Sequence, residues 1–270
     1  MREFQIRTSY RPRPLPTGRW AATERWNDLL FAHWPIPVGQ MADLLPPGLE
    51  PDLFQGTAWL GIVPFWLDRI RLHGLPYLSF GRHCPDLNLR TYVREPHTKT
   101  AGVYCFSIDA RSLLAVTVAR LGYQLPYYWA EMSMEQRGEH EFSFFSRRRM
   151  AHNPIVAFHA RYRGLGPNGR QAESIAGSFE SYMTDRGCLY SMTHVGQLQR
   201  ASLHTVAWPL EEAEAEIEYN SLAASIGLTL PPTQPILHYS RRLAVYVWPA
   251  ELVRPALARR PVTVAVSPSG

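Results

Sequence analysis

The pattern of hydrophobic and polar positions along the chain is mainly that of β-strands. Apolar and β-branched residues either alternate with polar ones or run without interruption over short segments bounded by turn-forming residues. These predicted strands are 57–65, 88–94, 102–108, 141–147, 155–163, 199–207 and 243–248.

Helical signals occur in four segments, which are 38–45, 110–121, 173–185 and 210–226. In the second, Asp109 is placed to cap the first turn and Gly122 to end the last one. The fourth follows Pro209, has acidic residues in its first turns and stops at Gly227, as the helix dipole and glycine C-caps favour. Strands still outnumber helices and no strand–helix–strand alternation is visible. The predicted fold class is therefore α+β with a mainly antiparallel sheet.

The two ends of the chain differ in composition from its interior. Residues 1–19 are rich in arginine and proline, which predicts a flexible N-terminal arm. Residues 255–270 begin with a proline- and alanine-rich stretch and are predicted to form a C-terminal tail. Between them, residues 20–254 contain no low-complexity linker and no internal repeat, so we expect a single domain.

Composition and charge narrow the classes of function. Hydrophobic residues make up 46% of the 270 residues, enough for an ordinary core. The 28 basic and 23 acidic residues give a net charge of +5, but the basic residues are almost all arginine and are scattered, so no nucleic-acid partner is expected. The three widely spaced cysteines, with no signal segment and no membrane-spanning apolar run, predict a cytoplasmic protein without a membrane partner.

Motifs for common cofactors and metals fail when their context is checked. Residues 164–169 match the G-x-G-x-x-G pattern, but Pro167 removes a backbone donor and Pro-Asn-Gly is a strong turn former. The histidines and cysteines show none of the usual metal-ligand spacings, and no G-x-S-x-G sequence occurs. The chain is therefore expected to use neither a cofactor nor a metal.

Strand 88–94 carries the first candidate for a binding site. Because successive side chains of a strand point to opposite faces, Asn88, Arg90 and Tyr92 should share one face. A buried guanidinium is costly unless it has a partner. Arg90 therefore either points to water or binds an anionic group in a pocket, and the sequence leaves both possibilities open.

The second candidate is the aromatic segment 123–132, which follows the predicted helix 110–121. Tyrosine combines an apolar ring with a polar hydroxyl, so Tyr127 and Tyr128 suit the wall of a pocket. The alternative is an aromatic core strand with Glu131 at its end. Both readings remain open at this level.

Several short motifs, taken in order, resemble the DUF2071 (YqjF-like) family. The most specific is Leu-Asn-Leu-Arg-Thr-Tyr-Val at 87–93. The other matching segments are 31–37, 44–49, 58–65, 102–110, 125–128, 208–210, 238–240 and 247–249. The resemblance is collinear from about residue 20 to residue 253. It implies an acetoacetate decarboxylase-like fold, a largely antiparallel, cone-like β-barrel with a pocket and a few peripheral helices, but it does not imply a reaction.

The same resemblance provides a test for decarboxylase chemistry. Acetoacetate decarboxylases form a Schiff base with one lysine of a Lys-Lys pair that follows a helix and a turn. Tyr127 and Tyr128 stand at the corresponding positions of this chain, and a phenol cannot form an imine. The one lysine, Lys99, lies in a predicted exposed hairpin loop. Schiff-base decarboxylase activity is therefore not expected.

These observations lead to a protein that binds a small anionic or polar molecule in a barrel pocket. Arg90 would hold the charged group, and Glu131 would orient Arg90 or act as a base. The other predicted ligand-binding residues are Asn88, Tyr92, Tyr104, Tyr127 and Tyr128. The alternative is a lysine-independent enzyme acting on a keto or enol acid, in which Glu131 moves the proton. An aromatic-rich chain can also form a homo-oligomer interface.

Overall fold

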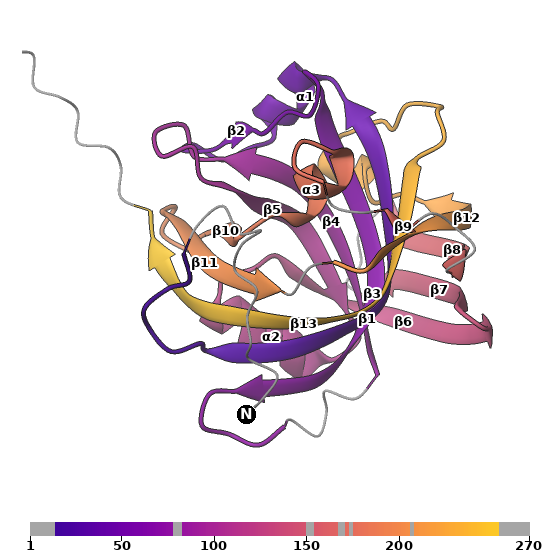
Figure 1. Ribbon diagram of the computed structural model, residues 1–270, viewed down its shortest axis with the longest axis horizontal. Helices are drawn as coiled ribbons and strands as arrows, with labels where there is room; N and C mark the ends of the chain where they lie inside the picture. Colours follow the sequence, from indigo (N-terminus) through magenta and orange to yellow (C-terminus); the bar gives the residue numbers. More distant parts are fainter. Residues whose placement is uncertain are drawn as a thin grey trace, which may run out of the picture.

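The computed structural model describes residues 14–77, 83–149, 154–166, 171–172, 175–205 and 208–253. Within these ranges, thirteen strands form one continuous sheet, joined by three α-helices and one short 3₁₀ helix (Figure 1). The strands are β1 (Ala22–Ile36), β2 (Glu50–Pro51), β3 (Ala58–Leu72), β4 (Cys84–Arg94), β5 (Ala101–Ala110), β6 (Tyr127–Gly138), β7 (Glu141–Arg148), β8 (Ala157–Gly164), β9 (Gln171–Ala172), β10 (Cys188–Met192), β11 (Leu198–Thr205), β12 (Leu210–Asn220) and β13 (Ile236–Leu252). The helices are α1 (Val38–Asp43), α2 (Leu113–Gly122), α3 (Phe179–Thr184) and the 3₁₀ helix η2 (Ala224–Ile226).

The sheet closes on itself and forms a barrel. The strand order β4-β3-β1-β13-β11-β10-β5 returns to β4 because β4 also pairs with β5. Strands β6, β7, β8 and β12 form a second layer at one side of the barrel (Figure 1). This layer is joined to the barrel at both ends, because β6 pairs with β5 and β12 pairs with β13. Most pairings are antiparallel, and β5 is the exception because it runs parallel to both β10 and β6. The predicted mainly antiparallel α+β class is confirmed.

Strands β1, β3 and β4 are buried on both faces, which explains their nearly continuous apolar sequences. Leu30, Ile62 and Leu89 belong to a core between the barrel and the second layer. Phe31 and Val63 belong to a separate core inside the barrel. One set of side chains therefore attaches the two layers, and the alternate set lines the barrel.

Each of the seven predicted strands has a counterpart in the structure, but segment 210–226 is a correction. It forms strand β12 and then η2 rather than one helix. The acids at every second position, Glu214, Glu216 and Glu218, point outward and pair with basic residues of β8. This period of two is the signal of a strand, and it overrides the terminal helix signals. Gly227 does adopt the left-handed conformation, but as the cap of η2.

The other helices are shorter than predicted. Helix α2 is capped by Ser112, whose side chain accepts a hydrogen bond from the Ala115 backbone, and not by Asp109. Asp109 is instead fully buried in β5. Helix α3 occupies only the later part of the predicted segment 173–185. None of the described helices is long and apolar enough to cross a membrane.

The division into arm, domain and tail stays a prediction. Residues 1–13 of the predicted arm and all of the tail 255–270 lie outside the described residues. Where the described chain begins, the carbonyl of Gly18 accepts a hydrogen bond of 2.8 Å from the indole of Trp248.

Candidate functional site

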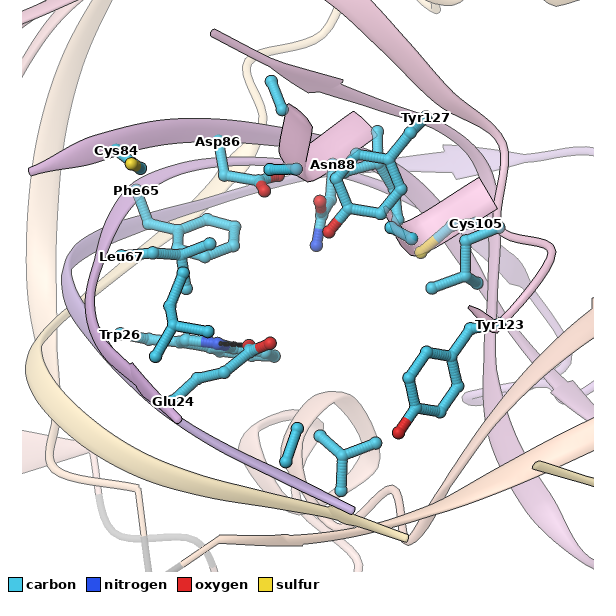
Figure 2. Close-up of a pocket in the computed structure, with 18 of the residues that line it drawn as sticks. Glu24, Trp26, Phe65, Leu67, Cys84, Asp86, Asn88, Cys105, Tyr123 and Tyr127 are labelled. Atoms are coloured by element: carbon cyan, nitrogen blue, oxygen red, sulfur yellow. Dashed lines mark hydrogen bonds between the residues drawn. The ribbon is translucent and has the colours of Figure 1, made fainter. Parts of the chain in front are cut away.

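A cavity of about 190 Å³ occupies the inside of the barrel (Figure 2). Its walls come from β1, β3, β4, β5 and the side of α2 that carries Ala115 and Ala119. Most of the lining is apolar and includes Trp26, Phe65 and Leu67. The few polar side chains in this lining are therefore the ones that can select a ligand.

Strand β4 supplies a row of three polar side chains to the cavity. Asp86, Asn88 and Arg90 occupy alternate positions and all three line it. They are 2%, 8% and 5% exposed, so water does not solvate them to any large extent. With a rise of about 3.3 Å per residue, the Cα atoms of Asp86 and Arg90 lie roughly 13 Å apart. A small molecule lying along β4 could therefore contact all three side chains.

Arg90 is a buried cation without a carboxylate partner among the described residues. One terminal nitrogen donates a hydrogen bond of 3.3 Å to the Tyr92 hydroxyl, and Nε has no partner. The guanidinium lies 5.3 Å from the ring centre of Phe31 and 5.7 Å from that of Tyr92. Ring faces attract a cation, but a buried charge ordinarily needs an opposite charge as well.

Two residues behind Arg90 fix its surroundings. His33 Nε2 lies 2.6 Å from the Tyr92 hydroxyl. Burial, helped by the charge of Arg90, lowers the pKa of His33 well below its usual range, so the imidazole is neutral. A Cβ atom on Gly61 would lie 3.0 Å from His33 Nε2 and 3.5 Å from Cγ of Arg90. The absence of a side chain at Gly61 therefore makes room for the His33 ring.

Two carboxyl groups face the same cavity, Asp86 from β4 and Glu24 from β1 (Figure 2). The indole of Trp26 donates a hydrogen bond of 2.9 Å to Glu24. Burial raises the pKa of Glu24, and burial together with the charge of Glu24 raises the pKa of Asp86 well above the ordinary carboxyl range. The phenol of Tyr127 interacts with the Asp86 carboxyl, and one Asp86 oxygen has no hydrogen-bond partner. Both acids are thus placed to exchange protons with a bound molecule.

The cavity thiols are poorly suited to act as nucleophiles. Burial raises the pKa of Cys105 to about 12, so this side chain stays a neutral thiol. Burial also raises the pKa of Cys84, at the opposite wall. In the part of the chain that the structure describes, no group of three His, Cys, Asp or Glu side chains could hold a metal ion.

Comparison with known proteins now places the chain in a family. The model of DUF2071, described as an uncharacterized conserved protein, matches residues 23–244. The chain belongs to the DUF2071 family. This DUF2071 protein is 38% identical over 236 residues to the uncharacterized protein YqjF of Bacillus subtilis (strain 168), covering 87% of this chain and 93% of that one.

Solved structures share the fold of this DUF2071 protein at low sequence identity. Acetoacetate decarboxylase from Legionella pneumophila superposes with a TM-score of 0.57 at 11% identity, over 95% of each chain. An acetoacetate decarboxylase-like enzyme from Sphingomonas wittichii RW1 gives 0.58 at 11% identity, over 89% of this chain and 96% of that one. The enduracididine biosynthesis enzyme MppR, complexed with pyruvate, gives 0.58 at 10% identity, over 87% and 91%. The acetoacetate decarboxylase-like fold expected from the sequence is confirmed.

The predicted site residues of the DUF2071 protein separate into two groups. Asn88, Arg90 and Tyr127 line the cavity, and Tyr92 lies directly behind Arg90. Tyr104 and Tyr128 do not line it, because they point to the other side of β5 and β6 and border a shallow surface depression.

Glu131 is a correction. It is exposed on β6 and accepts a hydrogen bond of 2.7 Å from Arg147, which lowers the pKa of the carboxyl. It does not line the cavity, so it can neither orient Arg90 nor act there as a base. The expected surface position of Lys99 is confirmed, since its amine is exposed and lies 3.0 Å from Glu50.

The sequence reasoning missed Asp86, Glu24 and Tyr123 as cavity residues. Asp86 continues the alternation of Asn88 and Arg90 by one step, so extending that strand by two residues would have found it. Glu24 had no comparable signal, because β1 contains a bulge that interrupts its alternation.

Proposed function

We propose that this protein binds a small carboxylic acid in the barrel cavity, with Arg90 holding the carboxylate. The observation that carries the proposal is the buried guanidinium of Arg90, a residue of the cavity lining, which takes part in no ion pair among the described residues. Arginine presents parallel N–H groups that match the two oxygens of a carboxylate. Such a ligand would supply the negative charge that no described residue provides to Arg90.

The cavity also limits the size and polarity of the ligand. A cavity of about 150 Å³ accepts benzene, and this one measures about 190 Å³. Its walls are mainly aliphatic and aromatic side chains. The proposed ligand is therefore a compact acid with an apolar body.

Binding is proposed to be non-covalent. The cavity lining contains no lysine, and a phenol, that of Tyr127, stands where the family resemblance places the lysine pair. A Schiff base with a carbonyl ligand is therefore not part of the proposal. MppR, which shares the fold, is known in complex with pyruvate, so oxo acids belong among the ligands to test.

The proposal predicts a ligand-induced thermal shift that depends on Arg90. We expect butanoate, benzoate, 2-oxobutanoate or 4-oxopentanoate to raise the melting temperature of the wild-type protein, because a ligand at a hundred times its Kd adds about 2.7 kcal/mol. In Arg90→Gln the affinity should fall by at least about thirtyfold, since truncating one partner of a buried charged pair costs roughly 2–5 kcal/mol.

Two controls make this experiment decisive. Arg94→Gln changes an arginine of the same strand that pairs with Glu50 at the surface, and it should bind as the wild type does. Butanamide and benzamide have the shape of the acids without the charge and should give no shift. Arg90→Lys keeps a charge if Arg90→Gln does not fold, and it should bind with intermediate affinity. Equal shifts in wild type and both Arg90 variants, or no shift with any acid, would contradict the proposal.

A further inference from the structure

The two cavity carboxyls lie across the space that the proposed ligand would occupy. Glu24 is on β1 and Asp86 on β4, and these strands are separated by β3. Asp86 pairs with Phe65 of β3, and the neighbours of Glu24, Thr23 and Arg25, pair with Arg71 and Asp68, so the two acids are also offset along β3. Figure 2 shows both carboxyls turned toward the central space, with Tyr127 beside Asp86. This separation leaves room for a small molecule to contact both acids.

Each carboxyl is held by a neighbouring side chain rather than by an arginine or lysine. The Trp26 indole fixes Glu24, and Tyr127 interacts with Asp86. Among the described residues, neither acid forms an ion pair, although Arg90 and Arg111 line the same cavity. Asp86 is 2% exposed and keeps one oxygen without a partner. An ion pair would hold either carboxyl in its charged form, so both remain free to gain and lose a proton.

The two acids should lose their protons in sequence as the pH rises. The negative charge of Glu24 is one of the causes that raise the pKa of Asp86, while the pKa of Glu24 is raised mainly by its own burial. Glu24 therefore ionises first, and Asp86 keeps its proton longer. Two carboxyls whose environments separate their pKa values are the usual arrangement of a base facing an acid.

We infer that Glu24 and Asp86 form an acid–base pair that enolises a carboxylic acid containing a carbonyl group, bound through its carboxylate to Arg90. This inference rests on the proposed function, because Arg90 positions the substrate. It extends that function from binding to proton transfer and identifies the substrate class as oxo acids.

The step balances without any further reactant. The Glu24 carboxylate takes a proton from the carbon next to the carbonyl, and the electron pair of that C–H bond forms the carbon–carbon double bond. The carbonyl oxygen takes the proton of the Asp86 carboxyl, with Tyr127 beside it. The products are the enol, a neutral Glu24 and an ionised Asp86, and the reverse step restores the starting state.

The distance along β4 indicates which oxo acids fit. Arg90 and Asp86 are four residues apart on the same face, roughly 13 Å between Cα atoms. Asn88 lies between them and can donate to the bound molecule from its side-chain amide. A carbonyl separated from the carboxylate by two or more carbons, as in 4-oxopentanoate, should therefore fit better than the adjacent carbonyl of 2-oxobutanoate.

Exchange of carbon-bound hydrogen for deuterium tests the inference directly. We would follow by proton NMR the loss of the C–H signals next to the carbonyl of 4-oxopentanoate and 2-oxobutanoate in D₂O. The wild-type protein should accelerate the loss. Glu24→Gln should slow the protein-dependent rate by at least about a hundredfold, as expected for removal of a general base. Asp86→Asn should slow it as well, and both variants should still show the thermal shift.

The controls separate failure of this inference from failure of the proposed function. Glu131→Gln removes an exposed acid outside the cavity and should change neither exchange nor binding. Arg90→Gln should lose both. A wild-type protein that shows the thermal shift with these oxo acids but no accelerated exchange overturns the inference alone, as does full exchange by Glu24→Gln. If neither acid shifts the melting temperature, their binding, and the inference with it, is overturned.

Discussion

Replacing Asp109 with alanine should lower the free energy of unfolding by about 3–5 kcal/mol, because it leaves a buried cation without its partner. Arg148 Nε lies 2.8 Å from Asp109 Oδ1, and the two side chains are 5% and 0% exposed. Ser146 also donates a hydrogen bond of 3.0 Å to Asp109. The guanidinium of Arg148 lies 4.0 Å from the ring centre of Tyr128, so it cannot turn to water without losing this contact. Urea unfolding monitored by tryptophan fluorescence measures the change.

A double substitution tests whether the Asp109–Arg148 ion pair stabilises the fold more than two apolar side chains would. Asp109→Leu combined with Arg148→Met removes both charges, and a buried ion pair replaced by apolar residues is often neutral or stabilising by about 1–4 kcal/mol. The double variant should therefore be more stable than Asp109→Ala. Glu214→Ala breaks an exposed pair with Arg163 and should cost less than about 1 kcal/mol. A loss in Asp109→Ala no larger than in Glu214→Ala would contradict the expected burial.

Asp86→Asn should stabilise the protein at neutral and alkaline pH. The pKa of Asp86 is raised in the folded state, chiefly by burial, so the folded protein binds this proton more tightly than the unfolded chain. Stability then falls as the pH rises from the ordinary carboxyl pKa, about 4, through the raised value. Asparagine does not ionise and avoids this loss. Leaving a buried polar group unsatisfied costs about 1–3 kcal/mol, and more when it is charged, so we expect a gain of at least about 1 kcal/mol at pH 8.

The pH dependence of this gain is its most specific feature. Unfolding at a series of pH values from 4 to 8 should show the advantage of Asp86→Asn shrinking toward zero in acid. Glu50→Gln is the control of opposite sign. Hydrogen bonds from Lys99 and then Arg94 lower the pKa of Glu50, so its contribution to stability is present above the ordinary carboxyl pKa and lost in acid. Glu50→Gln should therefore destabilise at pH 8 and have little effect at pH 4. A variant Asp86→Asn that is less stable than wild type at every pH would contradict the assignment.

The inward face of β4 could be predicted from sequence because one alternation rule decides it. Asn88 and Arg90 share a face in any strand, and the two-sided burial of the segment makes that face an interior one. The rule does not state what lies opposite. Glu24 reaches the same cavity from a distant part of the chain, across β3, and only the strand order shows this.

Bulges and parallel pairing limited the prediction elsewhere. In β1, Glu24 and Trp26 point inward, but after the irregularity near Asp28, which has a φ of 53°, Phe31 and His33 point inward instead. A strict period of two fails across such a shift.

In β6, the adjacent residues Tyr127 and Tyr128 point to opposite faces, so only one of them can face the cavity. Parallel pairing with β5 places Tyr127 opposite Ile108, which also lines it. Tyr128 consequently points outward. No feature of the segment alone distinguishes these two phases. Glu131 shares a face with Tyr127, but it lies beyond the part of β6 that pairs with β5, which the sequence does not reveal.

The space left by the missing side chain of Gly61 brings together three positions that are distant in sequence. A side chain at position 61 competes for the space of the His33 ring. We therefore expect the residues at positions 33 and 61 to vary together among relatives with this fold. Alanine at position 61 would place its Cβ 3.0 Å from His33 Nε2, so the imidazole ring would have to shift, whereas 3.5 Å from Arg90 Cγ is an ordinary contact. Glycine at this one site thus preserves the space of the His33 ring, whose partner Tyr92 accepts the hydrogen bond from the arginine of the proposed acid-binding site.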